Sequence, residues 1–225
     1  MPMFVGLDLG QAQDPTALAV VEKIYPLVPE PASYRPSDLF RDGQPTQPVR
    51  ATLPPLFHVR HLERPKLGTP YPKIVELVKR RLQHPDLRGA TLVVDATGVG
   101  RAVIDMFRDA GLHPKPVTIT SGDAVSYVDG YWRTPKRDLV GVLQVLLQSE
   151  RLKVAEELPD AQLLTRELLN FKVRITEAAH DTYGAWREGE HDDLVLSVSL
   201  AIWFAEHGVV WIPPRTPPVS QVTQW

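Results

Sequence analysis

Four acidic residues stand where carboxylates could do chemistry, because each lies at one end of an apolar segment. Asp8 lies inside the sequence GLDLG, and Asp95 ends the sequence LVVD. Asp192 and Asp193 open the apolar segment that precedes the C-terminal tail. A carboxylate within apolar surroundings loses hydration, so it is unfavourable there unless a cation compensates it. The sequence therefore indicates acidic groups that need a positively charged partner.

Each acid also has a simpler interpretation. Asp8 could form a turn with the following glycine, and Asp95 could cap a helix that begins after it. Asp192 suits an N-cap position, and Asp193 suits the positive end of a helix. The combination points further: if the strands that carry Asp8 and Asp95 are neighbours, their axes lie about 4.8 Å apart and both acids could share one cation. A helix that brings Asp193 to the same place would complete a carboxylate cluster.

All-oxygen ligands favour hard cations, so the expected cofactor is Mg²⁺ or Mn²⁺. Two such ions about 3.5–4 Å apart can activate water and stabilise the leaving oxygen of a phosphodiester. The expected ligands are Asp8, Asp95 and Asp193, with Asp192 as a fourth or alternate ligand. The first three are also the predicted catalytic residues.

Hydrophobic periodicity predicts the elements that must position these acids. Short apolar runs indicate strands, and helical spacing of apolar residues indicates helices. A mixed α/β fold follows, with a central sheet of five or more strands and helices on both faces. We expect the first strand to lie between the second, antiparallel, and the fourth, parallel. The expected strands are 3–9, 16–24, 56–62, 91–95 and 116–120, a hairpin covers 171–183, and the helices are 71–83, 98–110, 135–149, 159–169 and 191–206.

Length and composition limit the class of protein. The chain has 225 residues, 43% of them hydrophobic, which suits one domain with a real core. It has no Cys, which excludes disulfides and thiolate metal sites. No apolar run approaches the roughly 18 residues that span a bilayer. Proline is concentrated in two stretches, so we expect a domain over 1–210, a Pro-rich insertion at 26–55 and an extended tail at 211–225.

The net charge of −2 does not by itself indicate nucleic-acid binding, so any nucleic-acid-binding surface must be a local basic patch. Arg133, Lys136 and Arg137 lie together in the sequence near aromatic residues, and Lys172 and Arg174 lie in the expected hairpin. These cations could neutralise phosphates, with binding that weakens as salt rises. They could equally be ordinary surface charges. No base-reading motif is visible, so little sequence specificity is expected.

Four segments, in order, resemble the C-terminal nuclease domain of phage terminase large subunits, a member of the RNase H-like (retroviral-integrase-like) superfamily. They are GLDLG with the following DPTA, VVDATGVG, TPK at the start of a helix, and HDDL at the start of the last helix. Together they span residues 6–205.

The resemblance implies an RNase H-like fold and a DNA endonuclease with two divalent cations. It carries over Asp8, Asp95 and Asp193 as metal ligands and Lys136 as a basic residue near the scissile phosphate. It also implies double-stranded DNA as the substrate, genome packaging in the cytoplasm of an infected or lysogenic host, and a packaging ATPase, portal or small terminase subunit as partner.

Other functions stay open. A Holliday-junction resolvase could use the same acids on the same fold. A sugar-kinase-like protein could use GLDLG as a phosphate-binding segment, although that architecture needs a longer chain. A non-catalytic packaging module could use the Pro-rich stretches for contacts. The Gly-rich loop of a packaging ATPase is missing from these 225 residues, so the chain is expected to be an excised domain, a stand-alone nuclease or one half of a split motor.

Overall fold

The computed structural model describes residues 1–10, 14–26, 53–98, 100–170 and 192–208, together with four short strands between them. Most of the predicted insertion at 26–55, the predicted tail at 211–225 and residue His191 lie outside the described residues. Within the described parts, no helix is long and apolar enough to cross a membrane.

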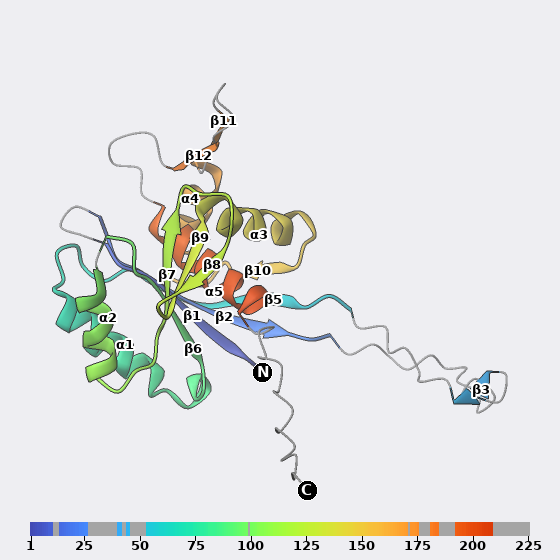
Figure 1. Ribbon diagram of the computed structural model, residues 1–225, viewed down its shortest axis with the longest axis horizontal. Coiled ribbons are helices and arrows are strands. Elements are labelled where there is room, and N and C mark those ends of the chain that lie inside the picture. The colour runs from blue at the N-terminus through green and yellow to red at the C-terminus, as the bar shows by residue number, and fades with distance from the viewer. Residues whose placement is uncertain are drawn as a thin grey trace, which may run out of the picture.

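An eight-stranded mixed sheet forms the centre of the fold, with the strand order β10-β5-β2-β1-β6-β7-β9-β8 (Figure 1). Its strands are β1 (Met3–Asp8), β2 (Ala17–Ile24), β5 (Leu56–Glu63), β6 (Thr91–Asp95), β7 (Lys115–Thr120), β8 (Ser126–Val128), β9 (Tyr131–Pro135) and β10 (Leu152–Val154). Two further pairs stand apart from it, β3 (Phe40–Arg41) with β4 (Gln44–Pro45), and β11 (Lys172–Ile175) with β12 (Asp181–Gly184).

The centre of the sheet confirms the predicted strand order. Strand β1 pairs with β2 in antiparallel register and with β6 in parallel register. Strand β5 is antiparallel to β2, so it runs in the same direction as β1. Strands β7 and β9 continue that direction beyond β6. The carboxyl ends of β5, β1, β6, β7 and β9 therefore meet at one edge of the sheet.

Alternating side chains of the strands build a separate core on each face of the sheet. One core contains Val5, Leu7 and Val94 with the inner sides of α1 (Tyr71–Leu82) and α2 (Gly100–Asp109). The other contains Phe4 and Val93 with α3 (Lys136–Gln148), α4 (Ala161–Asn170) and α5 (Asp193–His207). Figure 1 shows α1 and α2 grouped on one side of the sheet, and α3, α4 and α5 on the other. A short 3-10 turn, η2 (Pro85–Leu87), follows α1.

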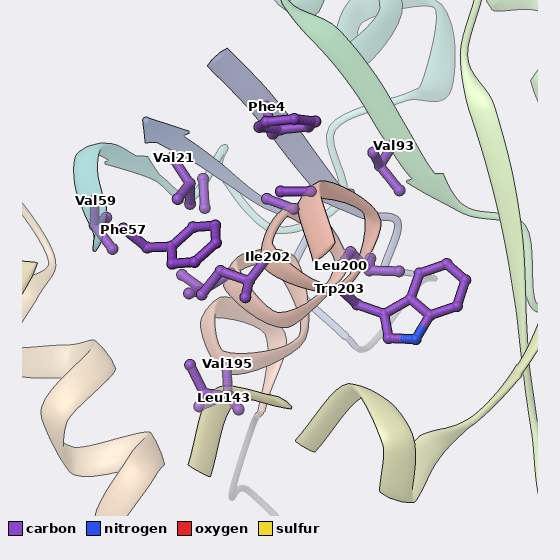
Figure 2. Packing of buried hydrophobic residues seen from close by; sticks show 14 of the residues in the cluster. Phe4, Val21, Phe57, Val59, Val93, Leu143, Val195, Leu200, Ile202 and Trp203 are labelled. Carbon is purple, nitrogen blue, oxygen red and sulfur yellow. The ribbon is translucent and has the colours of Figure 1, made fainter. Parts of the chain in front are cut away.

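Helix α5 is buried on all sides, because it lies between the sheet and the helices α3 and α4. Every residue from Asp193 to Ala205 is buried, and Leu194, Val198, Ala201 and Ile202 lie in the core of that face. Figure 2 shows Ile202 on the side of this helix toward Phe57, and Leu200 and Trp203 on the side toward Val93. A helix that is apolar all round is expected in the interior of a fold.

The close approach of α5 to β1 depends on Gly6. A Cβ atom at position 6 would collide with the backbone carbonyl of Ser197 in α5. A strand residue without a side chain lets the two backbones touch at this point. The glycine of the GLDLG segment therefore fixes how far α5, and with it Asp193, lies from the strand that carries Asp8.

The predicted long elements are confirmed with shifts of one or two residues at most ends, and the predicted hairpin forms as β11 and β12. Five strands were not predicted: β8, β9 and β10 of the large sheet, and β3 and β4 within the expected insertion. All residues of β8 are exposed, and β9 ends in a proline, so neither shows the apolar alternation that marks a strand. They extend the expected sheet at the side of β7, and β10 extends it beyond β5.

Candidate active site

The residues with chemical potential gather at the edge where the parallel strands end. Asp8 is the last residue of β1 and Asp95 the last of β6. Since Leu7 lies opposite Val94 in the parallel register, the two acids follow at the same level of neighbouring strands. Lys136 follows β9, and Arg64 follows β5. Ligand sites of open α/β sheets form at such carboxyl ends.

Asp8 and Asp95 are adjacent buried carboxyl groups, each about 8% exposed or less. Burial raises the pKa of Asp8 well above its usual value, and the neighbouring charges of Asp95, Asp193 and Asp192 raise that pKa further. Burial likewise raises the pKa of Asp95, although hydrogen bonds from Thr97 and Asp8 oppose the rise. Two carboxyl groups at hydrogen-bond distance share a proton more readily than they carry two charges.

Thr97 holds the carboxylate of Asp95 in place. Its backbone N–H donates to Oδ1 of Asp95 at 2.7 Å, and its hydroxyl oxygen accepts the N–H of Ile119 on β7 at 2.7 Å. The sharp turn after β6 therefore ties Asp95 to the next strand of the sheet. This hydrogen bond lies in the turn before α2, which begins at Gly100, so it is not a cap of that helix.

The first turn of α5 adds two more acids to the same cluster. Asp192 makes no side-chain capping hydrogen bond, which argues against the N-cap interpretation. Its Oδ2 instead accepts a hydrogen bond from Nζ of Lys136 at 2.7 Å. The positive charge of Lys136 partly opposes the rise in the pKa of both Asp8 and Asp95. The structure therefore brings together all four predicted acids and the predicted lysine.

Two residues of this site, Arg64 and Glu167, were not predicted from the sequence. Nη2 of Arg64 donates to Oδ2 of Asp193 at 2.9 Å, and Nη1 lies 3.6 Å from Oε1 of Glu167. Glu167 comes from α4 and is almost fully buried. Its Oε2 accepts the N–H groups of Leu194 at 2.9 Å and Val195 at 3.2 Å. Glu167 therefore caps α5 from a neighbouring helix, and burial raises its pKa to about 7.

The donor set fits a hard cation better than any other group. It offers buried carboxylate oxygens from three elements of the fold, and mutual repulsion together with desolvation raises the pKa of Asp8. A divalent cation removes both penalties at once. Among the described residues, no three His, Asp or Glu side chains already stand in a metal-binding arrangement. The ion pairs with Arg64 and Lys136 agree with that finding, since each engages one acid of the cluster.

The predicted DNA-facing cations have different surroundings. Arg133 is exposed on β9. Arg137 forms an ion pair with Asp123 at 2.7 Å and donates to its carbonyl oxygen at 3.0 Å. Lys172 and Arg174 lie in β11, and their side chains are outside the described part of the structure. Binding of DNA by these residues stays a prediction.

Comparison with known proteins gives structural matches only. No protein-family model matches the sequence, and no curated protein matches it. Among solved structures, the large terminase nuclease from thermophilic phage G20c with bound cobalt matches with a TM-score of 0.59 and 22% identity over 89% of this chain and 80% of that chain. The same nuclease with bound magnesium matches with a TM-score of 0.58 at the same identity and coverage.

A third match extends to a longer protein. The HK97 bacteriophage large terminase aligns with a TM-score of 0.52 and 13% identity, over 90% of this chain but only 39% of that chain. This chain thus corresponds in fold to one part of that terminase.

The sheet order, the helices on both faces and the acids at the carboxyl edge define an RNase H-like α/β protein. Within that class, the chain has the fold of large terminase nuclease domains, matched over about nine tenths of its length. The fold expected from the sequence resemblance is confirmed.

Proposed function

We propose that this protein is a metal-dependent DNA endonuclease. The observation that carries the proposal is the convergence of Asp8, Asp95 and the first turn of α5 at the carboxyl edge of the sheet, where the pKa of Asp8 is raised by burial and by the other acids. Such a site is costly to build without a cation to occupy it. The solved terminase nuclease with bound magnesium, which shares this fold, supports the same conclusion.

Asp8, Asp95 and Asp193 would hold the metal, and Asp192 would act as an additional or alternate ligand. One or two bound Mg²⁺ or Mn²⁺ ions would supply a nucleophilic water at neutral pH and neutralise charge on the phosphodiester. Asp8 and Asp95 would both act as ligands in the ionised form, and any proton between them would be released to solvent when the metal binds. Thr97 keeps Asp95 oriented while this happens.

Lys136 is placed to meet the phosphate. It lies at the first position of α3, whose N-terminus carries a partial positive charge, and it lies 2.7 Å from Oδ2 of Asp192. A phosphodiester that approaches the cluster can therefore exchange with Asp192 for the ammonium group. Lys136 would thus orient the substrate and offset its charge.

We further propose double-stranded DNA as the substrate and phage genome packaging as the setting. The supporting observation is that the solved matches reported above are terminases. A packaging ATPase, portal or small terminase subunit would be the partner, and the cytoplasm of the host would be the compartment. Arg133, Arg137, Lys172 and Arg174 would contact the DNA backbone without reading its sequence.

The test is cleavage of supercoiled plasmid by the 225-residue chain with Mn²⁺, Mg²⁺ or EDTA. We expect nicked and linear products only with a divalent cation, and loss of at least about a hundredfold in rate for Asp8→Asn and Asp95→Asn, since even partners of metal ligands cost 10–100-fold. Asp105→Asn, on the exposed side of α2, is the matched control and should cut like the parent. Equal cleavage by the parent and both site variants would overturn the site assignment.

The same assay distinguishes the substrates. Linear duplex and a four-way junction of equal length are compared at equal concentration. A terminase-like nuclease should cut both at similar rates. A strong preference for the junction would identify a resolvase instead, and failure to cut any DNA would leave a non-catalytic packaging role.

A further inference from the structure

Arg64 and Glu167 form a charged pair behind the carboxylate cluster that the proposed chemistry does not use. Arg64 is 17% exposed at its side chain, and Glu167 is 5% exposed. Charged side chains at such burial are rare unless they are paired. Their place next to Asp193 therefore calls for an explanation beyond stabilisation of the fold.

Arg64 links the cap of α5 to a predicted metal ligand. Its two Nη atoms point to different acids, Nη2 to Oδ2 of Asp193 at 2.9 Å and Nη1 to Oε1 of Glu167 at 3.6 Å. The first is a charge-assisted hydrogen bond, and the second is an ion pair without hydrogen-bond geometry. Arg64 is thus the positively charged partner of Asp193. Glu167 attracts the same guanidinium group from another direction.

A guanidinium at this distance and a divalent ion on the same carboxylate repel each other. Arg64 therefore opposes metal binding by its charge while it holds Asp193 in one orientation. Glu167 weakens that opposition, because its negative charge partly neutralises the guanidinium of Arg64. Glu167 also fixes the backbone that carries Asp193 through the N–H groups of Leu194 and Val195.

We propose that Arg64 and Glu167 are positioning residues that set the affinity of the cluster for its divalent cation, with opposite signs. Arg64 is the resident counter-cation of Asp193 and competes with the metal. Glu167 restrains Arg64 and so favours the metal. The inference rests on the proposed metal site, and it concerns the two residues behind that site.

The test is calorimetric titration of Mn²⁺ into the full 225-residue chain at pH 8. We expect Arg64→Gln to bind Mn²⁺ about fivefold more tightly and Glu167→Gln about fivefold more weakly, as for loss of one partly buried ion pair. The double variant should return to within about twofold of the parent. Arg64→Lys keeps the charge and should retain the affinity of the parent.

A second pair on the same strand supplies the matched control. Arg60 of β5 donates to Oε2 of Glu22 at 2.7 Å, away from the cluster. Glu22 lies opposite Met3 at the start of β1, whereas Asp8 lies at its end. Arg60→Gln and Glu22→Gln therefore remove the same kinds of charge at the far end of these strands and should leave the Mn²⁺ affinity unchanged. Thermal unfolding of every variant in EDTA shows whether the fold is retained, and Glu167→Gln keeps an amide oxygen that can accept the N–H of Leu194.

A purely structural role makes different predictions. It requires both single variants to weaken Mn²⁺ binding or both to leave it unchanged, and either result overturns the inference. A parent that binds no Mn²⁺ contradicts the metal site and the inference together. If the parent binds Mn²⁺ and the variants change its affinity in the predicted directions, but the parent cuts no DNA, only the proposed nuclease function is contradicted.

Discussion

Each end of helix α5 is capped by a charged side chain from a neighbouring element, and the two charges are opposite. At the N-terminal end, the Glu167 carboxylate from α4 accepts the N–H groups of Leu194 and Val195. At the C-terminal end, the Lys23 ammonium from β2 donates to the carbonyl oxygen of Ala205 at 2.7 Å. Both charges suit the helix dipole at their end.

The ends differ in how their remaining charge is balanced. Lys23 also lies 3.3 Å from Oε1 of Glu206, so the C-terminal end is a closed ion pair. At the N-terminal end, carboxylates outnumber the cations Arg64 and Lys136. Burial raises the pKa of Asp8 there, and the neighbouring acids raise it further. Capping by a charged side chain is therefore common to both ends of α5. Only the N-terminal end, where the candidate site lies, has an excess of negative charge.

Substitution of one acid at the N-terminal end should have the largest effect on function. Asp193→Asn removes a predicted metal ligand and should lower plasmid cleavage with Mn²⁺ by at least about a hundredfold. Glu206→Gln makes the same change at the other end of α5 and should cut like the parent. Equal losses in initial rate for both variants would remove the distinction between the ends.

A change in β1 where it touches α5 should displace the helix and so disturb both of its ends. Gly6→Ala places a methyl group against the Ser197 carbonyl, so α5 must shift, at a cost of about 1–3 kcal/mol in the free energy of unfolding. Gly141→Ala in α3 meets no atom within 4 Å and should instead stabilise by up to about 1 kcal/mol. Urea unfolding in EDTA measures both. A Gly6→Ala protein as stable as the parent would contradict the close contact.

Removal of the Lys23 charge at the C-terminal end of α5 should lower the stability of the fold without changing metal binding. Lys23→Met leaves the Ala205 carbonyl and Glu206 without this donor and should cost about 1–3 kcal/mol of unfolding free energy. Lys73→Met, which breaks an exposed ion pair with Glu76, should cost less than about 1 kcal/mol. The Mn²⁺ affinity of the folded Lys23→Met protein should match that of the parent, and a changed affinity would show that the ends are coupled.

The smallest expected effect is a pH dependence of the metal-free protein. The pKa values of Asp8 and Asp95 are raised, and that of Glu167 rises from 4.5 to about 7, so the folded state binds these protons more tightly than the unfolded state. Stability from these groups is therefore present at acid pH and declines as the pH rises through the raised values.

Thermal unfolding in EDTA between pH 4.5 and 8 measures that decline. Asp8→Asn should flatten it and raise the unfolding temperature at pH 8, even though it removes a predicted ligand. The exposed-site variant Asp105→Asn should follow the parent. A steeper decline for Asp8→Asn would show that the carboxyl group of Asp8 is not strained by its surroundings.

The sequence was sufficient for the parts of the site that lie at the ends of apolar segments. Asp8 and Asp95 could be located because a carboxylate beside an apolar strand needs a partner, and the order of β2, β1 and β6 follows from connections and apolar runs. Lys136 could be located through the TPK segment of the family resemblance, at the start of a predicted helix. The two-ion chemistry and the DNA contacts stay predictions.

Arg64 and Glu167 could not be found in this way. Arg64 lies in a polar stretch after β5 and has the sequence features of a surface residue. Glu167 lies in an amphipathic helix, where a glutamate normally faces water. Its burial arises only when α4 packs against the first turn of α5, and no local pattern contains that contact. Strands β8 and β9 were missed for the related reason that partners in the sheet, not apolar alternation, define them.

The position of α5 also has a consequence during synthesis. The helix fills the centre of one core and supplies Asp193, yet the ribosome makes it after every strand of the large sheet. A nascent chain that stops before it lacks both the core of that face and one side of the carboxylate cluster. Assembly of the acidic site therefore waits for synthesis of α5, which would keep a shorter nascent chain from acquiring the proposed activity early.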